Sequence, residues 1–360
     1  MVYVIMIMIT IPLAYIWELK FLGQNFGEGF VLANKYVIRP SGNFWGGIAF
    51  LPLYFVYALQ YSLHSDYDNY NQTFINIKYG NGTIRELAVY WINKIIAELN
   101  LDFQIVYLII YAIAFLILAK CILNYSKDFA LSMVTFITIF FTLNFLQIRQ
   151  LVAVLICLYA YRFVTEYNFI KYSMCVLAAC MFHVSALIML PAYFVLSRNF
   201  KLSYYLVISG IFAFLNLFRE RIIVFFLTTF LPGYLGRHEM FRSFEMNKWD
   251  LIFVLYSLFL CGIFYQRIKN TNKSNSVFLN AVFIYFILFF FGRWIFEFDR
   301  FGYYFFIPII CLLPNMIECE KNKDFRYFLK ILSFALMIVL FVLKHGNEAV
   351  FQYVSILQVL

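Results

Sequence analysis

Residues 144–150 read Asn-Phe-Leu-Gln-Ile-Arg-Gln, and the apolar run that they open ends at residues 182–187, Phe-His-Val-Ser-Ala-Leu. An arginine close to two glutamines and a histidine near a serine therefore lie in sequence that is apolar enough for a membrane. A charged side chain at the centre of a membrane span costs about 2.5–3.5 kcal/mol on insertion scales. We expect polar groups that carry such a cost to serve a function.

The composition excludes a soluble globular protein. Of the 360 residues, 64% are hydrophobic and 13% are charged, and the mean hydropathy is +0.80, whereas soluble domains carry about 25% charged residues. The apolar runs are continuous and do not alternate, which excludes a transmembrane β-barrel. The sequence therefore predicts one all-α, polytopic integral membrane domain over residues 1–360. The seven cysteines are scattered and mostly lie in apolar runs, so they indicate small buried side chains.

A helix needs about 20 apolar residues to cross a bilayer. This length predicts eleven or twelve transmembrane helices, because one long run fits either a single helix or two short helices that meet near His183. The candidate spans are residues 1–17, 43–60, 103–122, 128–146, 150–165, 169–197, 203–218, 250–266, 276–292, 301–317 and 326–343.

The connectors decide the orientation, because Lys and Arg in short connectors stay on the cytoplasmic side. The connectors 198–201 and 267–275 are basic and are predicted inside. Residues 61–102 and 219–249 are then predicted as two larger loops at the outer face. Much of the net charge of +9 lies in short connectors, so it indicates orientation in a membrane and not a nucleic-acid partner.

The orientation is consistent only if residues 169–197 form a hairpin with His183 at its outer tip, since both flanks of this run are predicted inside. Within the second outer loop, the apolar stretch 221–231 is too short to cross a bilayer. It predicts an interfacial or re-entrant helix that would cover a site at the outer face.

This orientation gathers costly polar side chains from distant parts of the chain on one outer face, where we expect a site. They are Asp66, Arg149, His183, Arg293, Arg300 and, in the second outer loop, His238.

Arg149 is the first candidate for chemistry. Its guanidinium offers a fixed fork of donors that suits phosphate oxygens. Gln147 and Gln150 add neutral amides for phosphate or sugar hydroxyls. The alternative is an arginine at a helix end that extends to lipid head groups.

His183 is a candidate general base or substrate contact, and the alternative is a polar bond between helices. Ser185 lies two residues away, so on one helix it would face elsewhere, and a Ser–His nucleophile pair is not expected. Arg300 is a further candidate ligand near Arg293, although neighbouring acidic residues allow both arginines to form ion pairs within their own segment. Glu86 and His238 are weaker candidates, and no His, Cys, Asp or Glu spacing indicates a metal site.

Asp66 belongs to an Asp-Tyr-Asp sequence in the first outer loop. Carboxylates two residues apart diverge on a helix, so a shared metal is not expected. Asp66 is instead a candidate base or acceptor for a sugar hydroxyl, and the alternative is a solvated loop acid. Tyr67 and Tyr70 beside it are candidate stacking surfaces for sugars.

Taken in order, these residues resemble the Wzy-type (EpsG-like) polysaccharide polymerase family. The resemblance covers about residues 50–316. It is carried by Ser65-Asp66-Tyr67-Asp68-Asn69-Tyr70, Glu86, Gln147-Ile148-Arg149-Gln150, Phe182-His183-Val184-Ser185-Ala186-Leu187, and Arg300 with Tyr303-Tyr304.

The resemblance implies an enzyme at the outer face of the bacterial cytoplasmic membrane. It would transfer a growing glycan from polyprenyl diphosphate to a lipid-linked repeat unit, in synthesis of O-antigen, capsule or exopolysaccharide. Its partners would be the lipid-linked donor and acceptor and membrane lipid, with a chain-length regulator and a flippase as further candidates. No nucleotide sugar, cofactor, metal or nucleic acid is expected.

The candidate residues suit this chemistry. Arg149 and Arg300, with Arg293, would bind the diphosphate, and His183 or Asp66 would act as the base. The candidate sugar contacts are Gln147, Gln150, Tyr67, Tyr70, Glu86 and His238.

Two other classes of membrane protein remain as alternatives. A flippase or polysaccharide exporter should have polar groups along a path through both leaflets and two related halves, but the polar groups cluster on one side and no repeat is seen. A membrane acyltransferase that modifies glycans takes its acyl donor from the cytosol, so its decisive polar groups should include some at the inner face.

Overall fold

The computed structural model describes residues 2–25, 48–61, 65–82, 84–230, 248–292 and 298–346, together with residues 355 and 357. In these ranges the regular structure is helical, apart from an isolated bridge between Gln60 and Ser355. The helices are α1 (Val2–Asn25), α3 (Leu51–Ala58), α4 (Ser65–Lys78), α5 (Leu87–Glu98), α6 (Gln104–Tyr125), α7 (Phe129–Ile139), α8 (Phe141–Leu146), α9 (Ile148–Thr165), α10 (Phe169–Cys180), the 3₁₀ helix η1 (Val184–Ile188), α11 (Met189–Leu196), α12 (Leu202–Asn216), α13 (Arg219–Phe230), α15 (Lys248–Thr271), α16 (Lys273–Gly292), α17 (Phe298–Phe306), α18 (Ile309–Glu318) and α19 (Lys323–His345).

Within the described ranges, six helical segments are long and apolar enough to cross a membrane. Five shorter apolar helices accompany them, and all eleven coincide approximately with predicted spans. The structure therefore confirms an all-α, polytopic membrane protein. The six long segments are Gln104–Tyr125, Ile148–Thr165, Lys248–Thr271, Lys273–Phe290, Arg300–Glu318 and Lys323–His345, and the shorter ones are Ile5–Ile16, Phe129–Ile139, Phe169–Cys180, Val184–Leu196 and Leu202–Asn216.

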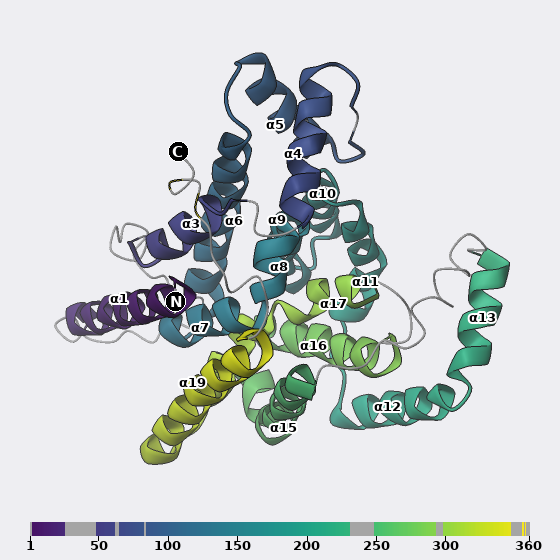
Figure 1. Ribbon diagram of the computed structural model, residues 1–360. Coiled ribbons are helices and arrows are strands. Elements are labelled where there is room, and N and C mark those ends of the chain that lie inside the picture. The colour runs from purple at the N-terminus through teal and green to yellow at the C-terminus, as the bar shows by residue number, and fades with distance from the viewer. Residues whose placement is uncertain are drawn as a thin grey trace.

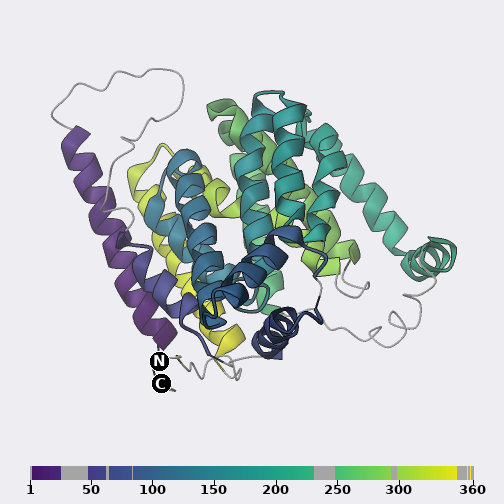
Figure 2. The same ribbon diagram turned by 90° about the horizontal axis from the view of Figure 1, so that it is seen from above.

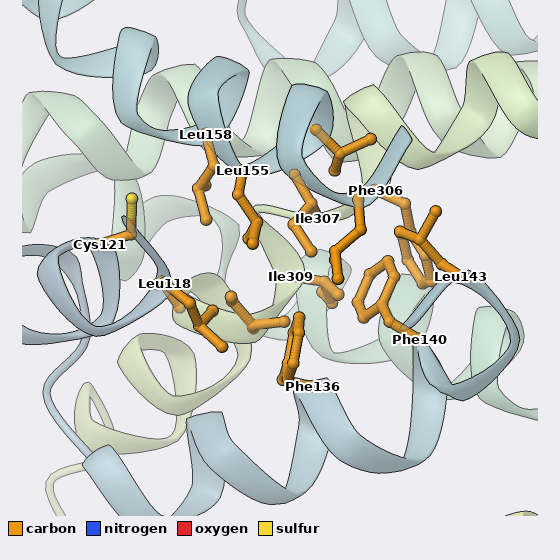
Figure 3. Close-up of a cluster of buried hydrophobic side chains, with 14 of the residues drawn as sticks. Leu118, Cys121, Phe136, Phe140, Leu143, Leu155, Leu158, Phe306, Ile307 and Ile309 are labelled. Atoms are coloured by element: carbon orange, nitrogen blue, oxygen red, sulfur yellow. The ribbon is translucent and has the colours of Figure 1, made fainter. Parts of the chain in front are cut away.

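Helix α9 lies at the centre of the helix bundle, where it contacts α6, α8, α10, α16 and α17. Residues 151–155 are fully buried, and a helix that is apolar on all sides is stable only in such a position. Figure 3 shows part of this core, in which Leu155 and Leu158 lie near Leu118 and Phe136 of neighbouring helices. The packing fixes the position of the first turn of α9, which carries Arg149 and Gln150.

The predicted span 128–146 is interrupted in the structure. Helix α7 begins after Asp128, whose carboxylate accepts a hydrogen bond from the Leu131 N–H at 2.8 Å, as an N-cap residue does. The short α8 follows, and Gln147 (φ −116°, ψ 53°) then separates it from α9. The break leaves Gln147 at the N-terminal end of α9 beside Arg149.

Residues 169–197 form a hairpin of two short helices, as the charge bias of the connectors predicts. The Tyr172 hydroxyl of α10 donates to the Met189 carbonyl of α11 at 2.7 Å. The rings of Phe169 and Tyr193, at the far ends of the same two helices, lie 5.0 Å apart. The helices are therefore antiparallel, and His183 lies in the turn between α10 and η1 with an extended backbone (φ −157°, ψ 118°).

Close packing of α16 against α17 positions Arg300. A side chain at Gly302 would place its Cβ 3.1 Å from the Tyr285 ring, so the glycine allows the two helices to approach. The rings of Tyr285 and Phe306 stack with centroids 3.8 Å apart. This packing helps to hold the N-terminal turn of α17 beside the first turn of α9, where Gln150 contacts Arg300.

Two groups of helices project from the bundle. Helices α4 and α5 lie together at the top of Figure 1, whereas α12 and α13 extend to the side opposite α1 in both views (Figures 1 and 2). The first outer loop of the sequence prediction therefore contains two helices. Residues 221–230 of the stretch predicted as a short interfacial helix are helical as well, within α13.

Candidate active site

A cavity of about 460 Å³ lies where α4 and α5 meet the first turn of α9. Eight of the eleven candidate residues from the sequence line it, and they come from α4, the start of α5, α9, the hairpin turn and α17. They are Asp66, Tyr70, Glu86, Gln147, Arg149, Gln150, His183 and Arg300.

Arg149 forms the electrostatic centre of the cavity. Its Nη1 lies 3.1 Å from Oε2 of Glu86, and its guanidinium lies over the Tyr70 ring at 5.0 Å from the centroid. Its Nε is buried and has no hydrogen-bond partner among the described residues. A cation in the first turn of a helix is disfavoured by the helix dipole, and the Glu86 carboxylate offsets that cost.

Gln150 joins α9 to α17. Its Nε2 donates to the Arg300 carbonyl at 2.6 Å. Because a backbone carbonyl only accepts hydrogen bonds, this contact fixes the orientation of the amide and identifies the other atom as Oε1. The Oε1 atoms of Gln150 and Gln147 are both buried without a partner in the described part of the chain. Both are therefore acceptors that a donor group of a ligand would satisfy.

His183 contacts Ser185, contrary to the expectation that the serine faces elsewhere. Nδ1 of His183 lies 2.6 Å from the Ser185 hydroxyl, which in turn lies 2.9 Å from the Tyr304 hydroxyl. The expectation is wrong because the helix ends before His183, so the two residues do not follow helical spacing.

Burial lowers the pKa of His183 to about 4, and the nearby charges of Arg149 and Arg300 act in the same direction. His183 lies in the hairpin turn, outside the helices on either side. Its imidazole is therefore neutral at pH 7 and has one N–H donor.

The Asp-Tyr-Asp sequence is helical in α4, and its carboxylates diverge as predicted. Asp66 lines the cavity, whereas Asp68 is exposed. Tyr70 lines the cavity too, but Tyr67 is 5% exposed and its hydroxyl donates to Oε1 of Gln104 at 3.0 Å. Tyr67 therefore packs between α4 and α6, and the structure does not place it where this cavity would hold a sugar.

A comparison of the sequence with models of protein families finds that the EpsG family model matches residues 43–355. The chain belongs to the EpsG family. Membership of this family indicates a function of the polysaccharide polymerase type, which is a glycosyltransferase-like activity. No curated protein and no solved structure matches the chain.

The cavity of this EpsG-family protein includes polar residues beyond those chosen from the sequence. Asn69 and Thr73 of α4 follow Asp66 at three and seven residues, the spacing of one helix face. Asn93 of α5 follows Glu86 by seven residues in the same way. This spacing is the sequence signal for helices within residues 61–102, which the connector charges predict only as an outer loop.

Arg293 and His238 lie outside the described residues of this EpsG-family protein. Helix α13, in the stretch predicted to cover the site, contributes no lining residue and lies away from α4 and α5 in Figure 1. Among the described residues, no group of three His, Cys, Asp or Glu side chains is arranged to hold a metal ion.

Proposed function

We propose that this EpsG-family protein is a polysaccharide polymerase of the bacterial cytoplasmic membrane. It transfers a growing glycan from polyprenyl diphosphate to a lipid-linked repeat unit at the outer face. The observation that carries the proposal is the one cavity that contains Arg149, Arg300, Asp66 and His183 from four distant segments.

The two arginines suit the leaving group. When a glycan leaves polyprenyl diphosphate, the broken bond adds negative charge to the phosphate oxygens. Cations held in place beside those oxygens stabilise the developing charge more than water does. Arg149 and Arg300 come from different helices, and the Gln150 amide ties one helix to the other. Their guanidinium groups can therefore bind the diphosphate from two directions.

The remaining lining residues suit sugars. Tyr70 offers an aromatic surface, and Gln147 and Gln150 offer acceptors for hydroxyl or amide protons. Ligand cavities usually have volumes of about 300–1,000 Å³, so about 460 Å³ holds a diphosphate and the sugars beside it. The polyprenyl chain would remain in the lipid.

Two groups in the cavity can assist the acceptor hydroxyl. The new glycosidic bond forms from the acceptor oxygen, whose proton must pass to a base or an aligned acceptor. Asp66 and His183 are the candidates. The lipid-linked donor and acceptor are thus the proposed partners, and a flippase and a chain-length regulator would act on the same polymer.

The experiment that tests the proposal replaces Arg149 by alanine and analyses the glycans of cells that depend on this protein. Loss of one charge-stabilising donor reduces a rate about 10²–10³-fold, so polymer should disappear and lipid-linked single repeat units should accumulate outside. Arg162→Ala is the matched control, because Arg162 lies at the other end of the same helix and pairs with Glu166 at 3.5 Å. This variant should make normal polymer.

Two other results of the Arg149→Ala experiment contradict the proposal. Accumulation of repeat units at the cytoplasmic face would identify a flippase. Normal polymer, with the variant inserted at the usual level, would leave Arg149 as a contact to lipid head groups.

A further inference from the structure

The hydrogen bonds of His183 determine which of its ring nitrogens carries the proton. The Ser185 backbone N–H donates to Nδ1 at 3.4 Å, and the Ser185 hydroxyl lies 2.6 Å from the same atom. A backbone N–H can only donate, so Nδ1 accepts and is unprotonated. The single proton of the neutral ring is then on Nε2, for which the described residues provide no partner.

Tyr304 stabilises the contact between His183 and Ser185, because its hydroxyl lies 2.9 Å from the Ser185 hydroxyl. Its ring is fully buried, and its backbone carbonyl accepts a hydrogen bond from the Tyr161 hydroxyl at 3.0 Å. Each hydroxyl has one proton, so when the Ser185 hydroxyl donates to Nδ1 of His183, the Tyr304 hydroxyl donates to Ser185. The three groups form a chain of hydrogen bonds that ends at Nδ1.

The surroundings also favour the neutral ring. His183 lines the cavity together with Arg149 and Arg300, and two nearby cations oppose a second proton on the imidazole. A neutral histidine with a fixed N–H can polarise a substrate oxygen, as an electrophile and not as a base.

We propose that Ser185 and Tyr304 are positioning residues that hold His183 in its Nε2–H form, and that His183 donates this hydrogen bond to a diphosphate oxygen of the leaving lipid. Asp66 is then the group that accepts the proton of the acceptor hydroxyl. This inference rests on the proposed polymerase function and divides the roles that the sequence leaves open between His183 and Asp66.

The transfer step is balanced as follows. The bond between the anomeric carbon of the growing glycan and the diphosphate oxygen breaks, and its electron pair leaves with the diphosphate. The acceptor hydroxyl oxygen forms the new bond to the anomeric carbon, and its proton passes to the Asp66 carboxylate. His183 keeps its proton and only shares it with a diphosphate oxygen, where Arg149 and Arg300 neutralise the added charge.

The tautomer can be measured without any activity. The chain has four histidines, so nitrogen-15 NMR of the histidine-labelled protein in lipid nanodiscs, with His183→Gln for assignment, resolves the His183 ring. The expected spectrum shows protonated Nε2 and unprotonated Nδ1. A spectrum with protonated Nδ1 would overturn the proposal, whatever reaction the protein catalyses.

An isosteric pair of variants tests the role in the reaction. His183→Gln keeps an N–H donor, whereas His183→Glu offers an acceptor only. With lipid-linked repeat units in nanodiscs, the glutamine variant should retain at least tenfold more activity than the glutamate variant, because a lost donor costs about 10²–10³-fold. If the glutamate variant is the more active, His183 acts as a base and the proposal fails.

Ser185 supplies the test of positioning. Ser185→Ala should lower kcat about tenfold to 100-fold with KM nearly unchanged, because small misplacements of a reacting group have effects of this size. Ser185→Thr keeps the hydroxyl and should restore kcat, and Tyr304→Phe should shift the His183 tautomer signal. Accumulation of repeat units at the cytoplasmic face in cells with Arg149→Ala would refute the polymerase function and leave the measured tautomer standing, so the two proposals fail separately.

Discussion

The Tyr70 ring supports the Arg149 side chain in the cavity. Its ring lies under the Arg149 guanidinium at 5.0 Å, and its hydroxyl donates to the Leu146 carbonyl at 3.4 Å. A cation over an aromatic face is stabilised by about 0.5–2 kcal/mol. The ring therefore supports the arginine, and the long hydroxyl contact contributes less.

We expect Tyr70→Phe and Tyr70→Leu to differ. The phenylalanine keeps the ring and should retain most of the activity, whereas the leucine loses the cation–π contact and should lower kcat/KM about 2- to 30-fold. The rate of polymer formation from lipid-linked repeat units measures both. Equal losses in the two variants would show that the hydroxyl, not the ring, is the important group.

At the residue scale, the sequence singles out positions where burial of a polar group is costly in itself. Arg149, Gln150 and His183 stand out because each interrupts an apolar run, and the structure brings them to one cavity. The contact between His183 and Ser185 could not be predicted, since it depends on where α10 ends. The position of Tyr67 depends on which face of α4 carries it, and the sequence predicts only an outer loop there.

At the scale of elements, the start of α7 joins helices that are far apart in sequence. Asp128 caps α7, and its Oδ2 lies 2.8 Å from Nζ of Lys330 in α19. Lys330 also lies 2.6 Å from Oε1 of Glu318 at the end of α18. One lysine of α19 thus links the start of α7 to the end of α18.

Substitution of Asp128 separates the cap from the ion pair. Asp128→Asn keeps a good cap and loses the charge, whereas Asp128→Ala loses both, so alanine should be about 0.5–2 kcal/mol less stable than asparagine. Both should unfold more easily than the wild type, because Lys330 keeps only Glu318 as its partner. Thermal unfolding in detergent measures the order, and equal stabilities of the two variants would exclude a contribution from the cap.

At the scale of the whole molecule, the clustering of polar groups follows from the predicted orientation. Connector charges place Asp66, Arg149, His183 and Arg300 at one face, and the structure joins them in a cavity. The sequence also predicts the hairpin at 169–197, because both its flanks must lie on one side. It does not predict the break at Phe140, which divides the predicted span 128–146 into α7 and α8.

The orientation itself can be measured with single cysteines in a variant that lacks the seven native ones. Tyr79 after α4 is 73% exposed, and Lys321 before α19 is exposed. Tyr79→Cys should react in intact cells with a thiol reagent that cannot cross the membrane, and Lys321→Cys should react only after the cells are opened. The reverse pattern would place the cavity in the cytoplasm.

The pair between Glu86 and Arg149 means that the protein itself supplies a counter-ion for this cation. Under the proposed function, a diphosphate that reaches Nη1 of Arg149 would compete with this carboxylate. We therefore expect binding to be an ion exchange in which a group of higher charge replaces a single charge. Glu86 directly precedes α5, and the Ala88 N–H donates to the Met181 carbonyl at 3.0 Å, two residues before His183. This backbone contact connects the segment of Glu86 to the hairpin turn that holds His183. If a bound anion displaces the Glu86 carboxylate, we expect the position of the imidazole to change with it.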